Sequence, residues 1–227
     1  MKALLIHGLS SNSSAWWRIR AALEADGWEV TTPELRGHGG SPAADSYGLA
    51  DYAADIPSGP WNLVIGHSLG GAVAVLRAST TERLILLDPV LEVDAADVAA
   101  IRADQLGELD LTLDSIRTAK PHWHPRDHEL KVQAVRQVDP KAPVQSFDDN
   151  PKWDVVAEAR ALTVPTLILG GDHTVYSMLA TATAEAITAA NPLVEYRVIA
   201  GAGHSPHRDR PEETLAAIRA FLPSAVD

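Results

Sequence analysis

The stretch GHSLG, residues 66–70, places Ser68 between Gly66 and Gly70, directly after the apolar run LVI and before an alanine-rich run. A strand that turns sharply into a helix at this serine pushes the hydroxyl into the open, and the flanking glycines tolerate the crowding of such a turn. The pattern G-x-S-x-G in this strand–turn–helix setting is typical of a nucleophile elbow. The amide of Leu69 would then face any negative charge that develops on a group bonded to the serine oxygen.

A serine nucleophile needs a base within hydrogen-bonding reach, and the base needs an acid that orients it. His204, in GAGHS, follows the last apolar run of the chain, VEYRVI. Two aspartates also follow apolar runs, namely Asp172 in GGDH and Asp88 in LLDPV. Both satisfy the chain order Ser…Asp…His. We favour Asp172, because it stands one predicted strand before His204, and we keep Asp88 as the alternative acid.

A second donor for the same oxygen is expected after the first apolar run, in LLIHGLSS. Gly8 allows the backbone to turn closely, and the N–H of Leu9 would point at the same site as the N–H of Leu69. The other interpretation is that the HG pair forms only a tight turn.

The elements that must hold these residues alternate along the chain. Strands are predicted at 3–6, 29–32, 63–65, 83–87, 166–169 and 194–199, and helices at 14–25, 46–55, 70–79, 176–190 and 211–222. Buried strands separated by helices predict an α/β protein with a doubly wound, mainly parallel sheet. All strand ends named above then lie along one edge of the sheet.

One stretch interrupts this alternation. No strand is predicted from residue 89 to residue 162, where helical patterns are separated by proline and charged residues instead. Its length exceeds that of an ordinary connection. We therefore interpret 89–162 as a helical cap insertion, and 1–88 with 163–227 as the core. The last residues, 223–227, are expected to fray.

Composition excludes several classes of function. The formal net charge is −11 and no basic run occurs, so neither nucleic acid nor an anionic membrane is expected as a partner. The chain has no cysteine, which rules out disulfides and thiol nucleophiles. The first apolar run begins at residue 3, which leaves no room for a signal peptide and leads us to expect a cytoplasmic protein. The sequence carries no signal of oligomeric state.

Five stretches together resemble the α/β-hydrolase superfamily across essentially the whole chain. They are HGLS at 7–10, RGHGGS at 36–41, GHSLGG at 66–71, GGD at 170–172 and GAGHSPH at 201–207. The methylesterase and hydroxynitrile-lyase branch and the monoacylglycerol-lipase and carboxylesterase branches are the most similar. The resemblance implies Ser68 as nucleophile, His204 as base and Asp172 as acid, with Leu9 and Leu69 as oxyanion donors. Members usually have two strands before the HG strand, so about six strands are expected here.

The resemblance and the residues together predict a cofactor-free serine hydrolase of the carboxylesterase type. Its substrate would be a small to medium carboxylic ester, cleaved through an acyl-enzyme. The same residues leave open a hydroxynitrile lyase, a lactonase, a carbon–carbon hydrolase, or a non-catalytic ligand receptor of the same fold.

The walls of the pocket are expected to come from residues near these motifs and in the insertion. The candidates are His7, Gly8, Trp16, Trp17, Trp123 and Trp153. For each tryptophan alone, filling of the core is the other interpretation. The histidines of PHWHPRDH, at 122, 124 and 128, do not have the spacing of a helix-borne metal site, so no metal is expected.

Overall fold

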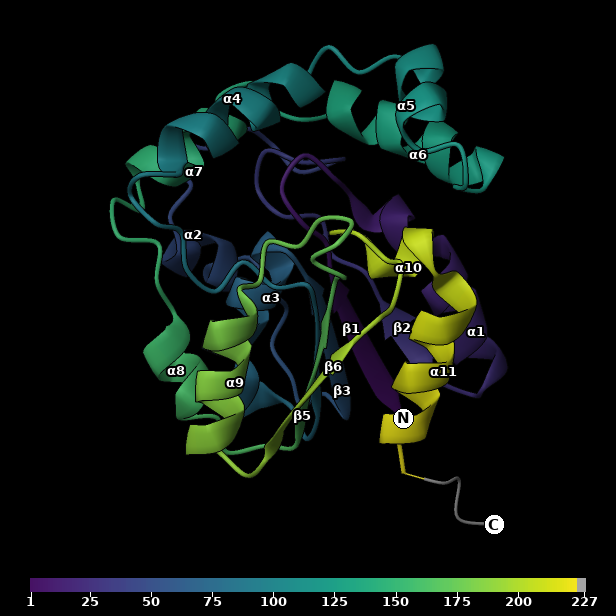
Figure 1. The fold of residues 1–227 in the computed structure, drawn as a ribbon, viewed down its shortest axis with the longest axis vertical. Helices are drawn as coiled ribbons and strands as arrows, with labels where there is room; N and C mark the ends of the chain where they lie inside the picture. Colours follow the sequence, from purple (N-terminus) through teal and green to yellow (C-terminus); the bar gives the residue numbers. More distant parts are fainter. Residues whose placement is uncertain (224–227) are drawn as a thin grey trace.

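The computed structural model of the protein describes residues 1–223 and contains one sheet of six parallel strands (Figure 1). The strand order is β2-β1-β3-β4-β5-β6. The strands are β1 (Lys2–Ile6), β2 (Glu29–Thr31), β3 (Leu63–His67), β4 (Leu84–Leu87), β5 (Thr166–Gly170) and β6 (Val194–Val198). The predicted α/β sheet and its six strands are thus confirmed. Beyond Pro223, the predicted fraying concerns residues outside the described part.

Helices cover both faces of the sheet, because alternate residues of each buried strand point to opposite sides. In β1, Leu4 and Ile6 belong to one hydrophobic cluster, whereas Ala3 and Leu5 belong to the other. The first cluster packs under α2 (Leu49–Ala54), α3 (Leu69–Leu76), α8 (Val156–Arg160) and α9 (Thr181–Ala190). The second packs under α1 (Trp17–Ala25) and α11 (Pro211–Phe221) (Figure 1).

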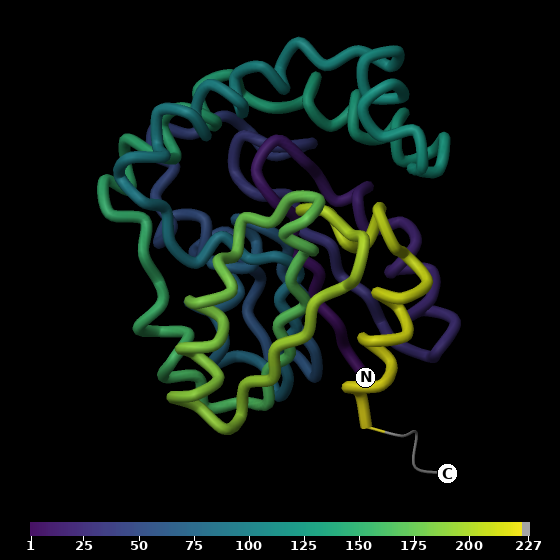
Figure 2. The backbone as a smooth tube through the Cα atoms, in the orientation of Figure 1, coloured from purple at the N-terminus to yellow at the C-terminus, as the bar shows by residue number. Residues whose placement is uncertain are grey.

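Four helices lie across the carboxyl ends of the strands, and we call them the cap helices (Figure 2). They are α4 (Val98–Glu108), α5 (Leu113–Ala119), α6 (Pro125–Arg136) and α7 (Ala142–Asp148). Helix α4 packs with α7, and α5 packs with α6. Helix α8 also falls in the predicted insertion, but it packs against α3 and α9 of the core. The domain limits at 88/89 and 162/163 stay a prediction.

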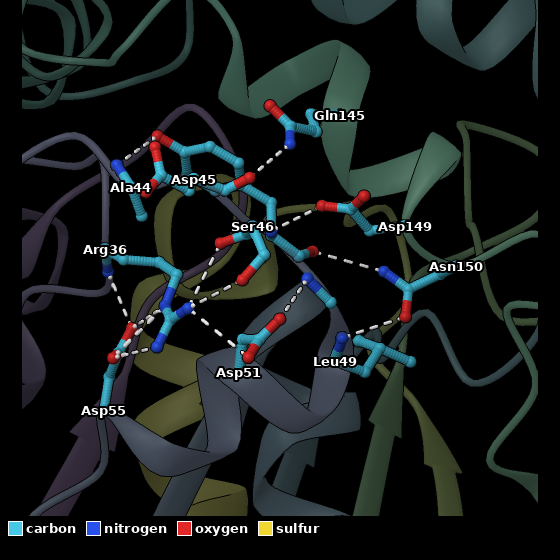
Figure 3. A network of polar contacts seen from close by, with 12 residues as sticks. Arg36, Ala44, Asp45, Ser46, Leu49, Asp51, Asp55, Gln145, Asp149 and Asn150 are labelled. Atoms are coloured by element: carbon cyan, nitrogen blue, oxygen red, sulfur yellow. Dashed lines mark hydrogen bonds and ion pairs between the residues drawn. The ribbon is translucent and has the colours of Figure 1, made fainter.

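A polar network fixes α7 and the residues after it to the loop that precedes α2 (Figure 3). The backbone amide of Tyr47 donates to Asp149 over 2.6 Å, and that of Leu49 donates to Asn150 over 2.9 Å. Side chains continue the connection, since Gln145 donates to the Asp45 carbonyl over 2.7 Å. This end of the cap is therefore attached to the core by several hydrogen bonds.

Within residues 1–223, none of the helices combines the length and the apolar composition that crossing a bilayer requires.

Candidate active site

Ser68 lies at the sharp turn between β3 and α3, with φ of 56° and ψ of −122°. This backbone conformation is strained for a residue with a side chain. The turn requires glycine on both sides of the serine. A Cβ on Gly66 would lie 2.2 Å from the Gly70 oxygen, and one on Gly70 would lie 2.2 Å from the Ile6 oxygen. The predicted elbow is thus present in the structure.

Ser68, His204 and Asp88 form a continuous chain of hydrogen bonds. The Oγ of Ser68 lies 3.0 Å from Nε2 of His204, and Nδ1 of His204 lies 2.6 Å from Oδ2 of Asp88. Because a carboxylate only accepts, Nδ1 carries the proton and Nε2 is free to accept the serine proton. The imidazole is therefore oriented as a base toward Ser68.

Asp88 is completely buried and is surrounded by donors. Besides His204, it accepts hydrogen bonds from the amide of Gly171 (2.9 Å), the hydroxyl of Ser177 (2.6 Å) and the amide of Met178 (2.9 Å). Burial alone would raise the pKa of Asp88, but the hydrogen bond and charge of His204 and the donors of Gly171 and Ser177 outweigh it and lower the pKa to about 2. The carboxylate is thus ionised at neutral pH.

Asp172, predicted as the acid, forms no hydrogen bond or ion pair with His204. Its carboxylate accepts hydrogen bonds from the amide of Gly201 over 2.9 Å and from the amide and hydroxyl of Thr174. Asp172 stabilises the loops after β5 and β6 instead. The structure therefore corrects the assignment in favour of the alternative, Asp88, which follows the strand next to β3 in the sheet.

The loop after β1 is fixed by two buried histidines. Nδ1 of His7 donates to the carbonyl of Gly8 over 2.9 Å, and the amide of Ser10 donates to Nε2 of His38 over 3.2 Å. Burial and the nearby His7 lower the pKa of His38 to about 3, which keeps its ring neutral. Because the C=O and N–H of one peptide point in opposite directions, the His7 bond also fixes the orientation of the Leu9 N–H.

His67 holds the backbone of the loop that carries His204, a role that the sequence alone does not predict. Its Nε2 donates to the backbone carbonyl of His204 over 2.7 Å, and the two rings lie 5.0 Å apart. The residue before Ser68 thus holds the backbone of the histidine that contacts Ser68. The sequence shows that a histidine precedes the serine of the elbow, but only the fold shows that His67 bonds to the His204 carbonyl.

A cavity of about 490 Å³ lies between this edge of the sheet and the cap helices. Ser68 and His204 line it together with Leu9 and Leu69. Apolar side chains from the cap, such as Ile101 and Phe147, form much of the remaining wall. The arrangement brings a serine with an adjacent base to the floor of a largely apolar pocket.

The family model described as "Alpha/beta hydrolase family" matches residues 3–218. The chain belongs to the alpha/beta hydrolase family. Over 111 residues the hydrolase is 32% identical to lipase LipV of Mycobacterium tuberculosis, a match that covers 44% of this chain and 41% of that protein. It is 21% identical over 253 residues to the sn-1-specific diacylglycerol lipase ABHD11 of Mus musculus, covering 96% of this chain and 80% of that protein.

Solved structures show the same fold. E-2-(acetamidomethylene)succinate hydrolase superimposes with a TM-score of 0.80 at 22% identity, over 97% of this chain and 91% of that chain. A thermophilic esterase from Thermogutta terrifontis superimposes with a TM-score of 0.76 at 23% identity, over 97% of this chain and 89% of that chain.

The predicted wall residues of the hydrolase fall into two groups. Trp123 and Trp153 line the cavity, as predicted. Trp16 does not line it, because it is buried under the sheet and stacks on His207 at 5.1 Å. Trp17 donates to Asp127 of α6 over 2.8 Å and supports the cap from outside.

His7 and Gly8, also predicted as wall residues, lie behind the cavity lining of the hydrolase. His7 is completely buried, and a Cβ on Gly8 would lie 2.9 Å from Cβ of Ser68. Both residues shape the loop rather than the pocket surface.

The three histidines of the insertion have separate partners. Nε2 of His122 donates to Asp209 over 2.8 Å, and Nε2 of His128 donates to the Lys120 carbonyl over 2.8 Å. His124 accepts from the amide of Arg126 at the start of α6. In the part of the chain that the structure describes, no three His, Cys, Asp or Glu side chains are grouped to hold a metal ion.

Asp209 joins the cap of the hydrolase to the loop that carries His204. Its carboxylate accepts from the indole of Trp123 over 2.7 Å and from the amide of Gly203 over 2.8 Å. Asp209 belongs to the short helix α10 (Pro206–Asp209). The second end of the cap is therefore attached directly to the site.

Proposed function

We propose that the hydrolase cleaves a carboxylic ester by a serine mechanism without a cofactor. The observation that carries this proposal is the chain of hydrogen bonds from Ser68 through His204 to Asp88 at the floor of the cavity. The curated relatives that the chain resembles include lipases, which act on esters, and this similarity supports the same class of bond.

In the first half-reaction, Ser68 Oγ attacks the ester carbonyl while Nε2 of His204 takes its proton. The buried carboxylate of Asp88 stabilises the imidazolium that forms. His204 then returns the proton to the leaving alcohol, and an acyl group remains on Ser68. In the second half-reaction, His204 takes a proton from water, the resulting hydroxide displaces the acyl group, and the serine regains its proton.

The tetrahedral oxyanion would be held by the amides of Leu9 and Leu69. Leu69 is the first residue of α3, so its N–H has no acceptor within the helix and lies at the positive end of the helix dipole. The His7 bond to the Gly8 carbonyl orients the Leu9 amide. Each such donor contributes about 10²- to 10³-fold to the rate in comparable enzymes.

Initial rates on p-nitrophenyl esters from acetate to long chains test this proposal. We expect Ser68→Ala to lower kcat by roughly 10⁴- to 10⁶-fold, whereas Ser58→Ala, at an exposed loop position, leaves it unchanged. The size of the cavity favours short to medium acyl groups. If wild type is no faster than Ser68→Ala on every ester, ester hydrolysis is refuted.

A second measurement separates ester hydrolysis from cyanohydrin cleavage, which needs no acyl-enzyme. Rapid quenching followed by intact-mass analysis should reveal an acyl group on the wild-type protein and none on Ser68→Ala. Release of cyanide from a cyanohydrin, without acylation by any ester, would favour the lyase instead.

A further inference from the structure

Arg208 is a buried cation at the site for which ester hydrolysis alone gives no role. It lies in α10, four residues after His204, and its side chain is part of the cavity lining together with Ser68. Only 5% of the residue is exposed. Arginine is rarely buried to this extent without a partner.

The guanidinium has no acceptor among residues 1–223. No side chain in this range forms a hydrogen bond with it or places a carboxylate oxygen within 4.0 Å, and its Nε is buried without a partner. The ring of Trp123 covers one side, with Cζ of Arg208 5.0 Å from the ring centroid. A stacked guanidinium still presents the N–H groups of its edge to a planar acceptor.

Three acidic groups lie near enough to stabilise the charge of Arg208 at longer range: Asp127, Glu108 and Asp209. Each of them is already engaged elsewhere. The Oδ1 of Asp127 accepts from Trp17, while its buried Oδ2 forms no hydrogen bond within residues 1–223 and lies 3.4 Å from Arg18. Glu108 pairs with Lys131, and Asp209 accepts from Trp123 and Gly203. Burial lowers the pKa of Arg208, and these three charges offset that effect only in part. The N–H donors of the guanidinium have no acceptor within residues 1–223.

The charge of the cavity lining matches a single negative charge on a ligand. The lining has one more cationic than anionic side chain, its charged residues being Lys120, Lys131, Arg208, Asp104 and Glu108. Lys131 is neutralised by Glu108 over 2.5 Å and donates to the Ser10 carbonyl over 3.1 Å. Of the two remaining cations, Lys120 and Arg208, neither has a carboxylate oxygen within 4.0 Å in the described residues, and Arg208 is the more deeply buried.

We propose that Arg208 binds a carboxylate of the substrate, so that the hydrolase selects esters that carry a free carboxylate beside the scissile ester bond. Two parallel N–H···O bonds from an arginine to a carboxylate are both strong and directional. A monoanion fits the lining better than a phosphate dianion, because Asp104 and Glu108 face the same cavity.

Binding tests the proposal without any turnover. Isothermal titration of Ser68→Ala compares monomethyl esters of malonic to adipic acid with the neutral dimethyl esters. For at least one chain length we expect the monoanion to bind about 10- to 100-fold more tightly. Adding Arg208→Met should abolish this preference, whereas adding Arg210→Met, at an exposed position in the same segment, should keep it. No preference at any chain length overturns the proposal.

Kinetics provide the second test, and this one rests on the proposed ester hydrolysis. The ratio of kcat/KM for a monomethyl ester to that for its dimethyl ester should exceed 1 in wild type and fall toward 1 in Arg208→Met. If that variant does not fold, Arg208→Gln, which keeps polarity without charge, takes its place. An unchanged ratio would show that Arg208 only packs against Trp123. If wild type hydrolyses no ester, the proposed function fails, while the titration still decides whether Arg208 binds carboxylates.

Discussion

Replacing Asp88 by asparagine removes the negative charge beside His204 and preserves the size of the side chain. Asparagine also suits the backbone, because Asp88 has φ of 37°, and Asn tolerates the left-handed region better than most residues. The matched change is Asp172→Asn, which alters a carboxylate whose hydrogen bonds go to Gly201 and Thr174. Only Asp88→Asn therefore removes a carboxylate that is hydrogen-bonded to His204.

The expected loss follows from the surroundings of Asp88. All four partners of its carboxylate are donors, so the NH₂ group of asparagine faces a backbone N–H in either orientation. In the transition state the imidazolium of His204 would also lose its counter-charge. Two unit charges about 4 Å apart at an effective dielectric constant of about 20 attract by about 4 kcal/mol. That energy corresponds to about a 10³-fold decrease in kcat.

Initial rates on p-nitrophenyl butyrate measure both variants, and circular dichroism with thermal melting confirms that each is folded. We expect Asp172→Asn to keep most of the wild-type kcat. If Asp172→Asn loses more activity than Asp88→Asn, or if folded Asp88→Asn remains as active as wild type, the assignment of Asp88 as the acid is refuted.

Two further changes test the packing around the site. His207→Phe should raise the Tm, because both ring nitrogens of His207 are buried without a hydrogen-bond partner among residues 1–223 and the ring stacks on Trp16. Burial holds the pKa of His207 well below its usual 6.5, so the ring takes up a proton below about pH 6.5 in the unfolded chain but not in the folded one. The free energy of unfolding therefore decreases as the pH falls below about 6.5. Thermal melting at about pH 7 and about pH 5 should therefore show a smaller acid-induced decrease in the variant, and an equal decrease would contradict the reasoning. Gly66→Ala should destabilise and inactivate the protein, since its Cβ would lie 2.2 Å from the Gly70 oxygen. Gly107→Ala in α4, where a Cβ meets no atom within 4 Å, should instead stabilise by about 0.5–1 kcal/mol, and calorimetry that ranked the two alanine variants the other way would refute both expectations.

The strands could be predicted from the sequence because each is a short apolar run followed by a turn. In contrast, α7 and α10 were not predicted. Both are short, with proline in the first turn, at Pro143 and Pro206. Within the insertion, proline is interpreted as a separator of helices, as at Pro143, although proline in the first turn also begins helices.

The site was predictable only where local sequence determines it. The elbow at Ser68 and the place of His204 follow from glycines and strand ends nearby. The choice between Asp88 and Asp172 does not, since chain order is the same for both and only their contacts in the fold distinguish them. The burial of Arg208 in the cavity lining could not be predicted from its neighbours in the sequence either. Trp123, against which it packs, comes from a distant part of the chain.

The proposed nucleophile and acid follow directly after paired residues of neighbouring strands. His67 and Leu87 are partners in the β3–β4 ladder, and the Ser68 amide donates to the Leu87 carbonyl over 3.2 Å. One β–α–β unit, residues 63–88, therefore encodes both groups in a contiguous stretch of chain. Of the three hydrogen-bonded groups Ser68, His204 and Asp88, only His204 comes from outside this unit. The loop after β5 therefore contributes donors in place of the acid, since Gly171, Ser177 and Met178 all donate to Asp88.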